Sequence, residues 1–177
     1  MMKLHLVDIS AYLIQAWQQE FRNFSNVHIV SADILSVAED TIVSPANSYG
    51  YMDGGIDFQY MNYFGQKIQT IVQEAISKRS GGMLPVGSSI LVQTGNKRIP
   101  RLIVAPTMEF PETIDPINAY RAMRAILRIA DQEEGRILNI YCPGLATGTG
   151  RVDPMDAAIQ MASAYADWTK GKDTRIE

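Results

Sequence analysis

The sequence predicts a single α/β domain in which helices cover both faces of a mixed central sheet, that is, a three-layer α/β/α sandwich. Short apolar runs of strand length alternate along the chain with longer segments whose apolar residues recur at helical spacing. The 177 residues suffice for one sizeable core, and we find no repeat, linker or low-complexity segment. We therefore assign residues 1–170 to one domain and residues 171–177 to a polar C-terminal tail.

The elements follow one another in a regular order. Strands are expected over residues 3–7, 27–32, 41–46, 88–93, 102–105 and 137–141. Helices are expected over residues 11–21, 57–64, 66–78, 118–133 and 154–168. Ser10 is a suitable N-terminal cap for the helix over residues 11–21. Gly135 is suited to end the helix over residues 118–133. Gly81 and Gly82 interrupt the chain before the fourth strand.

Polar and glycine residues follow several of the predicted strands directly. Asp8, Asp33 and Asn47 each come at or just after a strand end, and glycine-bearing loops follow the third and the last strand. Ligands of open α/β sheets bind beyond the carboxyl ends of the strands. The sequence therefore predicts a crevice for a polar ligand at this edge of the sheet.

Composition excludes several classes of function. The net charge is −3 and Lys and Arg form no dense block, which disfavours sequence-independent binding of nucleic acid. Cys142 is the single cysteine and there are two histidines, so a disulfide framework and the usual zinc sites lack ligands. The chain has neither a segment of membrane-spanning length nor the pattern of a signal peptide. We expect a soluble, cytoplasmic protein without a metal or cofactor.

The two glycine-bearing loops are typical of anion cradles. Residues 50–55 contain three glycines ahead of the second helix, and residues 144–150 contain three more ahead of the last helix. Glycine lets the backbone approach a ligand closely, and the amides of a helix N-terminus favour negative charge. Neither loop has the Gly-Lys-Ser/Thr ending of a P-loop or the glycine spacing of a Rossmann motif.

Four pieces of the sequence together resemble a macro domain, the α/β/α fold that binds ADP-ribose. Ala32-Asp33-Ile34 resembles the Gly-Asp-Ile of that family, and Ser44-Pro45-Ala46-Asn47 resembles its Asn-Ala-Ala-Asn. Gly54-Gly55-Ile56-Asp57 resembles its Gly-Gly-Val-Asp, after a gap of six residues that equals the gap in MacroD-type hydrolases. Ala146-Thr147-Gly148 resembles its Ser-Thr-Gly.

The resemblance implies a role for each matching residue. Asp33 and Ile34 would hold adenine, Asn47 would bind the distal ribose, and Asp57 would orient or activate a water, so that Asn47 and Asp57 are the catalytic candidates. The diphosphate would lie between two stretches of backbone, namely Gly54, Gly55 and Ile56 on one side and Thr147, Gly148, Thr149 and Gly150 on the other.

The activity implied is that of a mono-ADP-ribosyl hydrolase, which cleaves the bond between ribose C1 and a modified acceptor. The partner would be ADP-ribose or an ADP-ribosylated acceptor. Three departures from the family pattern favour a non-catalytic ADP-ribose-binding module instead. Ser44 stands at an asparagine position, Asp53 stands at the position of a small residue, and the second loop has Gly150-Arg151-Val152 in place of the aromatic that often covers the distal ribose. A phosphatase acting on ADP-ribose 1″-phosphate and a domain whose pocket takes another ligand are further alternatives.

The chain also differs from the family in the order of its elements. Macro domains carry a strand after their last helix, whereas this sequence ends soon after Trp168 and begins with an additional strand and helix over residues 4–21. We expect this N-terminal unit to fill the vacant place in the sheet, beside the strand that leads to Asp33, as in a circularly permuted fold. Ile9, Ser10 or Tyr12 would then lie at the adenine end.

Overall fold

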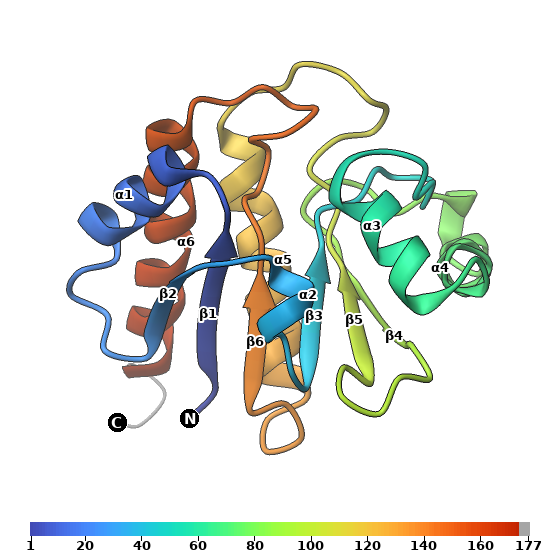
Figure 1. Ribbon diagram of the computed structural model, residues 1–177, viewed down its shortest axis with the longest axis horizontal. Coiled ribbons are helices and arrows are strands. Elements are labelled where there is room, and N and C mark those ends of the chain that lie inside the picture. The colour runs from blue at the N-terminus through green and yellow to red at the C-terminus, as the bar shows by residue number, and fades with distance from the viewer. Residues whose placement is uncertain (174–177) are drawn as a thin grey trace.

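The computed structural model describes residues 1–173, which form one sheet between two layers of helices (Figure 1). Within these residues the sheet has six strands in the order β2-β1-β6-β3-β5-β4. All neighbouring strands are parallel except the edge strand β4, which runs antiparallel to β5. The predicted three-layer α/β/α sandwich with a mixed central sheet is confirmed.

Every predicted strand and helix is present in the structure. The strands are β1 (Lys3–Asp8), β2 (Val27–Ser31), β3 (Thr41–Ser44), β4 (Ile90–Gln93), β5 (Arg101–Val104) and β6 (Asn139–Cys142). The helices are α1 (Ala11–Glu20), α2 (Ile34–Val37), α3 (Gly55–Phe64), α4 (Lys67–Ser77), α5 (Ile117–Gln132) and α6 (Pro154–Asp173), with a 3-10 turn η1 (Ser80–Gly82).

The alternation of side chains along each strand produces two cores. Leu4 and Leu6 of β1 pack with helices α1, α5 and α6 on one face of the sheet. Val7, the next residue, packs on the opposite face with α2, α3 and α4. Successive side chains of a strand point to opposite faces, so a single strand contributes to both cores. No helix of the described chain is both long and apolar enough to cross a membrane.

The structure differs from the sequence prediction at two short elements and at several boundaries, most of them by one or two residues and the end of the last helix by five. The helix α2 spans four residues and η1 spans three, too few for a periodic pattern to be recognised. The last helix continues to Asp173, so the predicted tail begins within α6, and residues 174–177 lie outside the described chain. Lys172 stabilises this last turn, because its ammonium lies 3.1 Å from the Asp131 carboxylate and 4.2 Å from the centre of the Trp168 ring.

The N-terminal strand occupies an interior position in the sheet. β1 pairs in parallel with β2 on one side and with β6 on the other. The expected placement of the N-terminal unit beside the strand that leads to Asp33 is therefore confirmed. Ser10 caps α1 as predicted, since its hydroxyl accepts the amide of Leu13.

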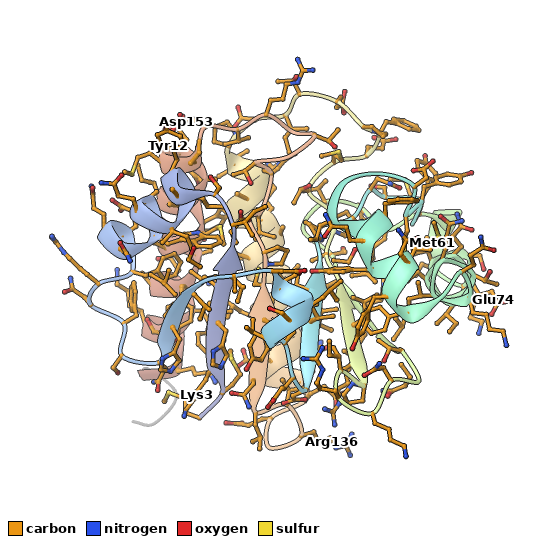
Figure 2. All side chains as sticks on the ribbon, in the orientation of Figure 1. Lys3, Tyr12, Met61, Glu74, Arg136 and Asp153 are labelled. Carbon is orange, nitrogen blue, oxygen red and sulfur yellow. The ribbon has the colours of Figure 1, made fainter. Side chains whose placement is uncertain are left out.

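Loops gather at one end of the sheet, beyond the carboxyl ends of the parallel strands. In Figure 1 the connections that follow β3, β5 and β6 lie together at the top of the view. Tyr12 and Asp153 mark the same end in Figure 2, whereas Lys3 and Arg136 mark the opposite end. The expected binding edge is thus the one at which Asp8, Asn47 and the second glycine loop meet.

Candidate functional site

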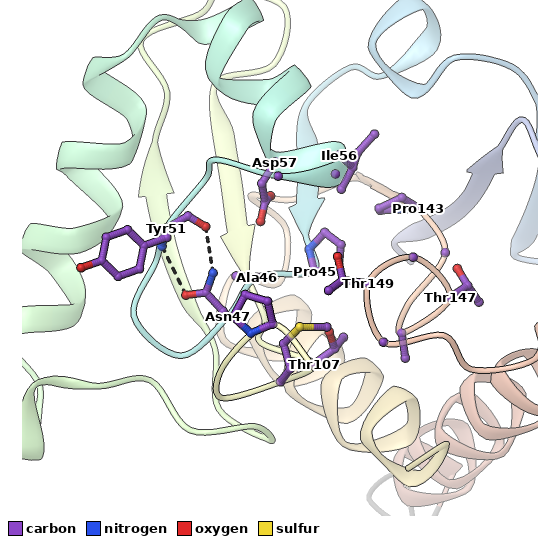
Figure 3. Close-up of a pocket in the computed structure, with 18 of the residues that line it drawn as sticks. Pro45, Ala46, Asn47, Tyr51, Ile56, Asp57, Thr107, Pro143, Thr147 and Thr149 are labelled. Carbon is purple, nitrogen blue, oxygen red and sulfur yellow. Dashed lines mark hydrogen bonds between the residues drawn. The ribbon is translucent and has the colours of Figure 1, made fainter. Parts of the chain in front are cut away.

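A cavity of about 250 Å³ lies at this edge of the sheet (Figure 3). Its walls come from the segments that follow four adjacent strands, namely β1, β6, β3 and β5. These segments contribute Asp8, residues 45–57, residues 107–111 and residues 143–150, with some members of each range facing elsewhere. The sheet therefore assembles into one cavity loops that are far apart in the sequence.

Most of the predicted site residues line this cavity. They are Asn47, Gly54, Gly55, Ile56, Asp57, Thr147, Gly148, Thr149 and Gly150. Figure 3 shows Ile56 and Asp57, at the start of α3, facing the loop that carries Thr147 and Thr149. The two glycine loops thus form opposite walls, as the sequence analysis expected.

Asp33 and Ile34 do not line the cavity. The carboxylate of Asp33 caps the short helix α2, since Oδ1 accepts the amide of Leu35 at 2.9 Å, and the residue is exposed. Ile34 is buried in the core on the α3 face of the sheet. Their assignment to adenine stays a prediction. Ile9 and Tyr12, also expected at the adenine end, are each 79% exposed.

Asp57 is the buried acid of the site. It lies in the first turn of α3, is 6% exposed, and accepts a hydrogen bond of 2.6 Å from the Ser44 hydroxyl at the end of β3. Burial raises the pKa of Asp57 from 3.8 to about 7, because it penalises the carboxylate more than the hydrogen bond from Ser44 favours it. A carboxyl group with such a pKa can exchange a proton with a ligand or a water at neutral pH.

The amide of Asn47 holds the first loop together. Its Oδ1 accepts the backbone amides of Tyr49 at 3.1 Å and Tyr51 at 3.3 Å, and its Nδ2 donates to the carbonyl of Tyr51 at 2.9 Å. Figure 3 marks the two contacts with Tyr51. A primary amide has two N–H groups, so one donor of Asn47 stays available to the cavity.

The first wall presents backbone amides at the start of α3. Gly54 is the N-cap and has no side chain to accept the first amides of the helix, which have no partner within it. Gly55 adopts a positive φ of 57°, and a Cβ added to it would meet no atom within 4 Å. This wall therefore offers unobstructed N–H donors to an anion.

The second wall depends on glycine for space. A Cβ at Gly150 would lie 2.7 Å from the carbonyl oxygen of Ala146 and 2.8 Å from Cγ1 of Ile114. A Cβ at Gly144 would lie 2.5 Å from Oγ1 of Thr147 and 2.6 Å from a methyl group of Leu13. The close contact at Gly150 includes a backbone carbonyl, so the loop strongly favours glycine there. At Gly144 an added Cβ would instead require the Thr147 and Leu13 side chains to shift.

The charged side chains that line the cavity are all acidic. Asp8, Asp53 and Asp57 contribute carboxylates, and no Lys or Arg is among the lining residues of the described chain. An anionic ligand would therefore be held by backbone amides and hydroxyl groups. The described residues include no group of three or more His, Cys, Asp or Glu side chains that could hold a metal ion.

Several lining residues lie outside the set of site residues predicted from the sequence. Asp8 accepts the amides of Ser10 and Gly144 and so connects β1 to the second glycine loop. Its position directly after a strand, like that of Asn47, was a usable signal. Thr107, Met108 and Pro111 come from the loop after β5, and their sequence carries no comparable signal.

A family model described as "Macro domain" matches residues 43–161, which include the end of β3, the whole of β5 and β6, and both glycine loops. The chain belongs to the macro domain family. The match leaves out β1, α1, β2 and α2, and so it does not cover the N-terminal unit of β1 and α1. An uncharacterized protein of Aquifex aeolicus is 37% identical over 137 residues, which are 77% of this chain and 78% of the relative.

Solved macrodomain structures have the same fold. The macrodomain of Mycobacterium tuberculosis DarG superposes with a TM-score of 0.67 at 21% identity, over 78% of this chain and 88% of that chain. A structure titled "Thermosipho africanus DarTG in complex with ADP-ribose" superposes with a TM-score of 0.64 at 14% identity, over 90% of this chain and 49% of the other. At these identities the likeness concerns the fold of the macro domain.

Proposed function

We propose that this macro domain binds ADP-ribose in the cavity between the two glycine loops. The diphosphate would lie against the amides at the start of α3, and the distal ribose would approach Asn47 and Asp57. The opposed loops and the ligand of the Thermosipho africanus structure support this proposal. We keep Asp33 and Ile34, which do not line the cavity, as the proposed adenine contacts.

We further propose that the domain is a mono-ADP-ribosyl hydrolase. The observation that carries this proposal is the buried carboxyl of Asp57, which lines the cavity and has a pKa of about 7. The Asp57 carboxylate would accept a proton from a water as the water oxygen attacks ribose C1. The bond between C1 and the acceptor then breaks; where the acceptor is a carboxyl group it leaves as a carboxylate, and Asp57 returns its proton to solvent.

The alternative of a non-catalytic ADP-ribose-binding module rests on the carboxylates at the cavity. Asp53 is an exposed lining residue and no Lys or Arg among the described residues lines the cavity, which disfavours the close approach of additional anionic groups. The acceptor is unidentified. We also propose a cytoplasmic location, where the single buried cysteine, Cys142, would stay reduced.

Two measurements test the proposed function. Calorimetry with ADP-ribose, and with AMP and NAD as controls, tests binding, and we expect ADP-ribose to bind more tightly than either control. Release of ADP-ribose from an ADP-ribosylated protein tests hydrolysis, with Asp57→Ala expected to lose turnover and to retain binding. Equal turnover by Asp57→Ala would exclude Asp57 as the base, and the absence of heat with ADP-ribose at millimolar concentration would reject the ligand.

A further inference from the structure

Ser44 and Asp57 form a buried pair that joins the sheet to the start of α3. Ser44 is the last residue of β3 and is 1% exposed, and Asp57 is 6% exposed. The Ser44 hydroxyl lies 2.6 Å from Oδ1 of Asp57. Both residues are fixed by regular secondary structure, so the contact is part of the framework of the site.

The pair leaves one oxygen of Asp57 for the cavity. Oδ1 is occupied by Ser44, and we find no other hydrogen bond to this carboxyl group within residues 1–173. Asp57 itself lines the cavity, and Figure 3 shows its side chain directed into it. The geometry therefore leaves Oδ2 to face a ligand or a water.

The groups around Asp57 do not compensate its charge. On its own helix, the buried Tyr60 donates its hydroxyl to the carbonyl of Val43 and is not directed at Asp57. The cavity is also lined by Asp8, at the end of β1, and by Asp53, in the loop before α3, which are further carboxylates. Ser44 is thus the only polar side chain of the described residues that favours the ionised form of Asp57.

A hydroxyl group suits this position for a chemical reason. It donates its proton to a carboxylate, and it can rotate and accept the proton of a carboxylic acid. The contact can therefore persist in both protonation states of Asp57, as a residue that gains and releases a proton requires. Alanine offers neither interaction, whereas threonine offers both.

We propose that Ser44 is the positioning residue of this site, which holds Asp57 through Oδ1, directs Oδ2 into the cavity and favours the ionised base at neutral pH. This inference rests on the proposed function for its consequence in turnover. Its structural part, the control of Asp57 by Ser44, can be measured without any substrate.

The first experiment follows the protonation of Asp57 by ¹³C NMR of its carboxyl carbon in the whole chain. Ser44→Ala removes a hydrogen bond to the ionised form, and we expect the titration midpoint of Asp57 to rise by about one pH unit. Ser44→Thr should restore the original midpoint. Ser48→Ala is the matched control, because Ser48 is equally buried but its hydroxyl lies against the carbonyl of Met108; this variant should leave the midpoint unchanged.

The second experiment records turnover against pH for the same variants. We expect the rising limb of the profile to move to higher pH in Ser44→Ala, by the same interval as the NMR midpoint, with recovery in Ser44→Thr. If Ser44→Ala does not fold, Ser44→Cys, with its weak donor, should give an intermediate shift. An unchanged midpoint in the folded variant would overturn the inference. Absence of turnover in the wild-type chain would instead reject the proposed hydrolase, while the titration would still decide the role of Ser44.

Discussion

At the scale of single residues, Asp57 combines burial with a cavity that contains no cation among its lining residues. Its pKa is about 7 in the folded state and near 3.8 in the unfolded state. Between these two values the folded state binds more protons than the unfolded state. The free energy of unfolding therefore falls as pH rises from about 4 to about 7, and this loss persists at higher pH.

This linkage predicts that Asp57→Asn stabilises the domain above pH 7. The amide carries no charge and can still accept the hydroxyl of Ser44 through Oδ1. We expect a gain of a few kcal/mol at pH 8, which corresponds to a rise in Tm of roughly 5–10 °C, and little gain at pH 4. Thermal unfolding of both proteins across this pH range is the measurement. A gain of the same size at every pH would contradict the linkage.

The same carboxyl predicts opposite pH trends for binding and turnover. The diphosphate of ADP-ribose is anionic, so its affinity should fall as Asp57 ionises through pH 7. Turnover needs the ionised base and should rise over the same interval. Calorimetry and a turnover assay at matched pH values test this. In Asp57→Asn the affinity should become nearly independent of pH, and two parallel trends in the wild-type protein would argue against Asp57 as the base.

At the scale of elements, the loop between β6 and α6 is held in shape by its own packing. The amide of Val152 donates to the carbonyl of Ala146 at 3.0 Å, and the amide of Ile114 donates to the carbonyl of Gly150 at 3.1 Å. The second contact joins this loop to the segment that precedes α5. The two segments therefore form one wall of the cavity.

Gly150→Ala should disturb this wall, whereas Gly148→Ala should not. An added Cβ at Gly150 meets the Ala146 carbonyl and the Ile114 side chain at under 3 Å, but at Gly148 it meets nothing within 4 Å. We expect Gly150→Ala to lower stability by about 1–3 kcal/mol and to weaken ADP-ribose binding. Chemical denaturation and calorimetry measure the two effects. Equal stability of the two variants would show that the loop relaxes without cost.

Most strands and helices could be predicted from the sequence, because apolar residues recur with a regular period along strands and long helices. The helix predicted over residues 118–133 corresponds to α5, whose apolar face is buried, and the strand predicted over residues 102–105 corresponds to β5. Helix α2 has only four residues, which are too few to show helical periodicity. The last turn of α6 makes a tertiary contact between Lys172 and Asp131, which the local sequence pattern does not indicate.

The site could be predicted only in part, for a similar reason. Residues of the loops that follow strands, such as Asn47 after β3 and Gly148 after β6, were assigned to the cavity that they line. Asp33 does not line the cavity and instead caps α2, a short helix that the sequence pattern did not predict. The hydrogen bond between Ser44 and Asp57 joins two elements, so neither residue alone indicates it.

At the scale of the whole molecule, β1 is an interior strand of the sheet, although it comes first in the sequence. It lies between β2 and β6, and α6 ends at the same end of the sheet at which β1 begins (Figure 1). The N-terminal unit could therefore follow α6 in the chain without moving in space. This is the structural basis for regarding the fold as circularly permuted.

A permuted chain tests this relationship. New ends opened between Arg22 and Asn23, both exposed, with a flexible linker joining the original ends, should give a folded protein with ADP-ribose affinity close to that of the parent. Circular dichroism, thermal unfolding and calorimetry are the measurements. Deletion of residues 1–22 is the control, and it should prevent folding because β2 and β6 lose their shared neighbour. A deletion variant as stable as the parent would contradict the structural role of β1.

The central position of β1 also has a consequence for synthesis on the ribosome. Leu4 of β1 is opposite Ile140 of β6 in the sheet. Within the domain, β1 is therefore synthesised before all the other strands but can pair with its second neighbour only after β6, the last strand in the order of the described chain, has been synthesised. The cavity also needs residues 143–150, which follow β6 directly. A nascent chain that has not yet exposed this region lacks the binding site, and nucleotide capture is therefore delayed until translation of the domain is nearly complete.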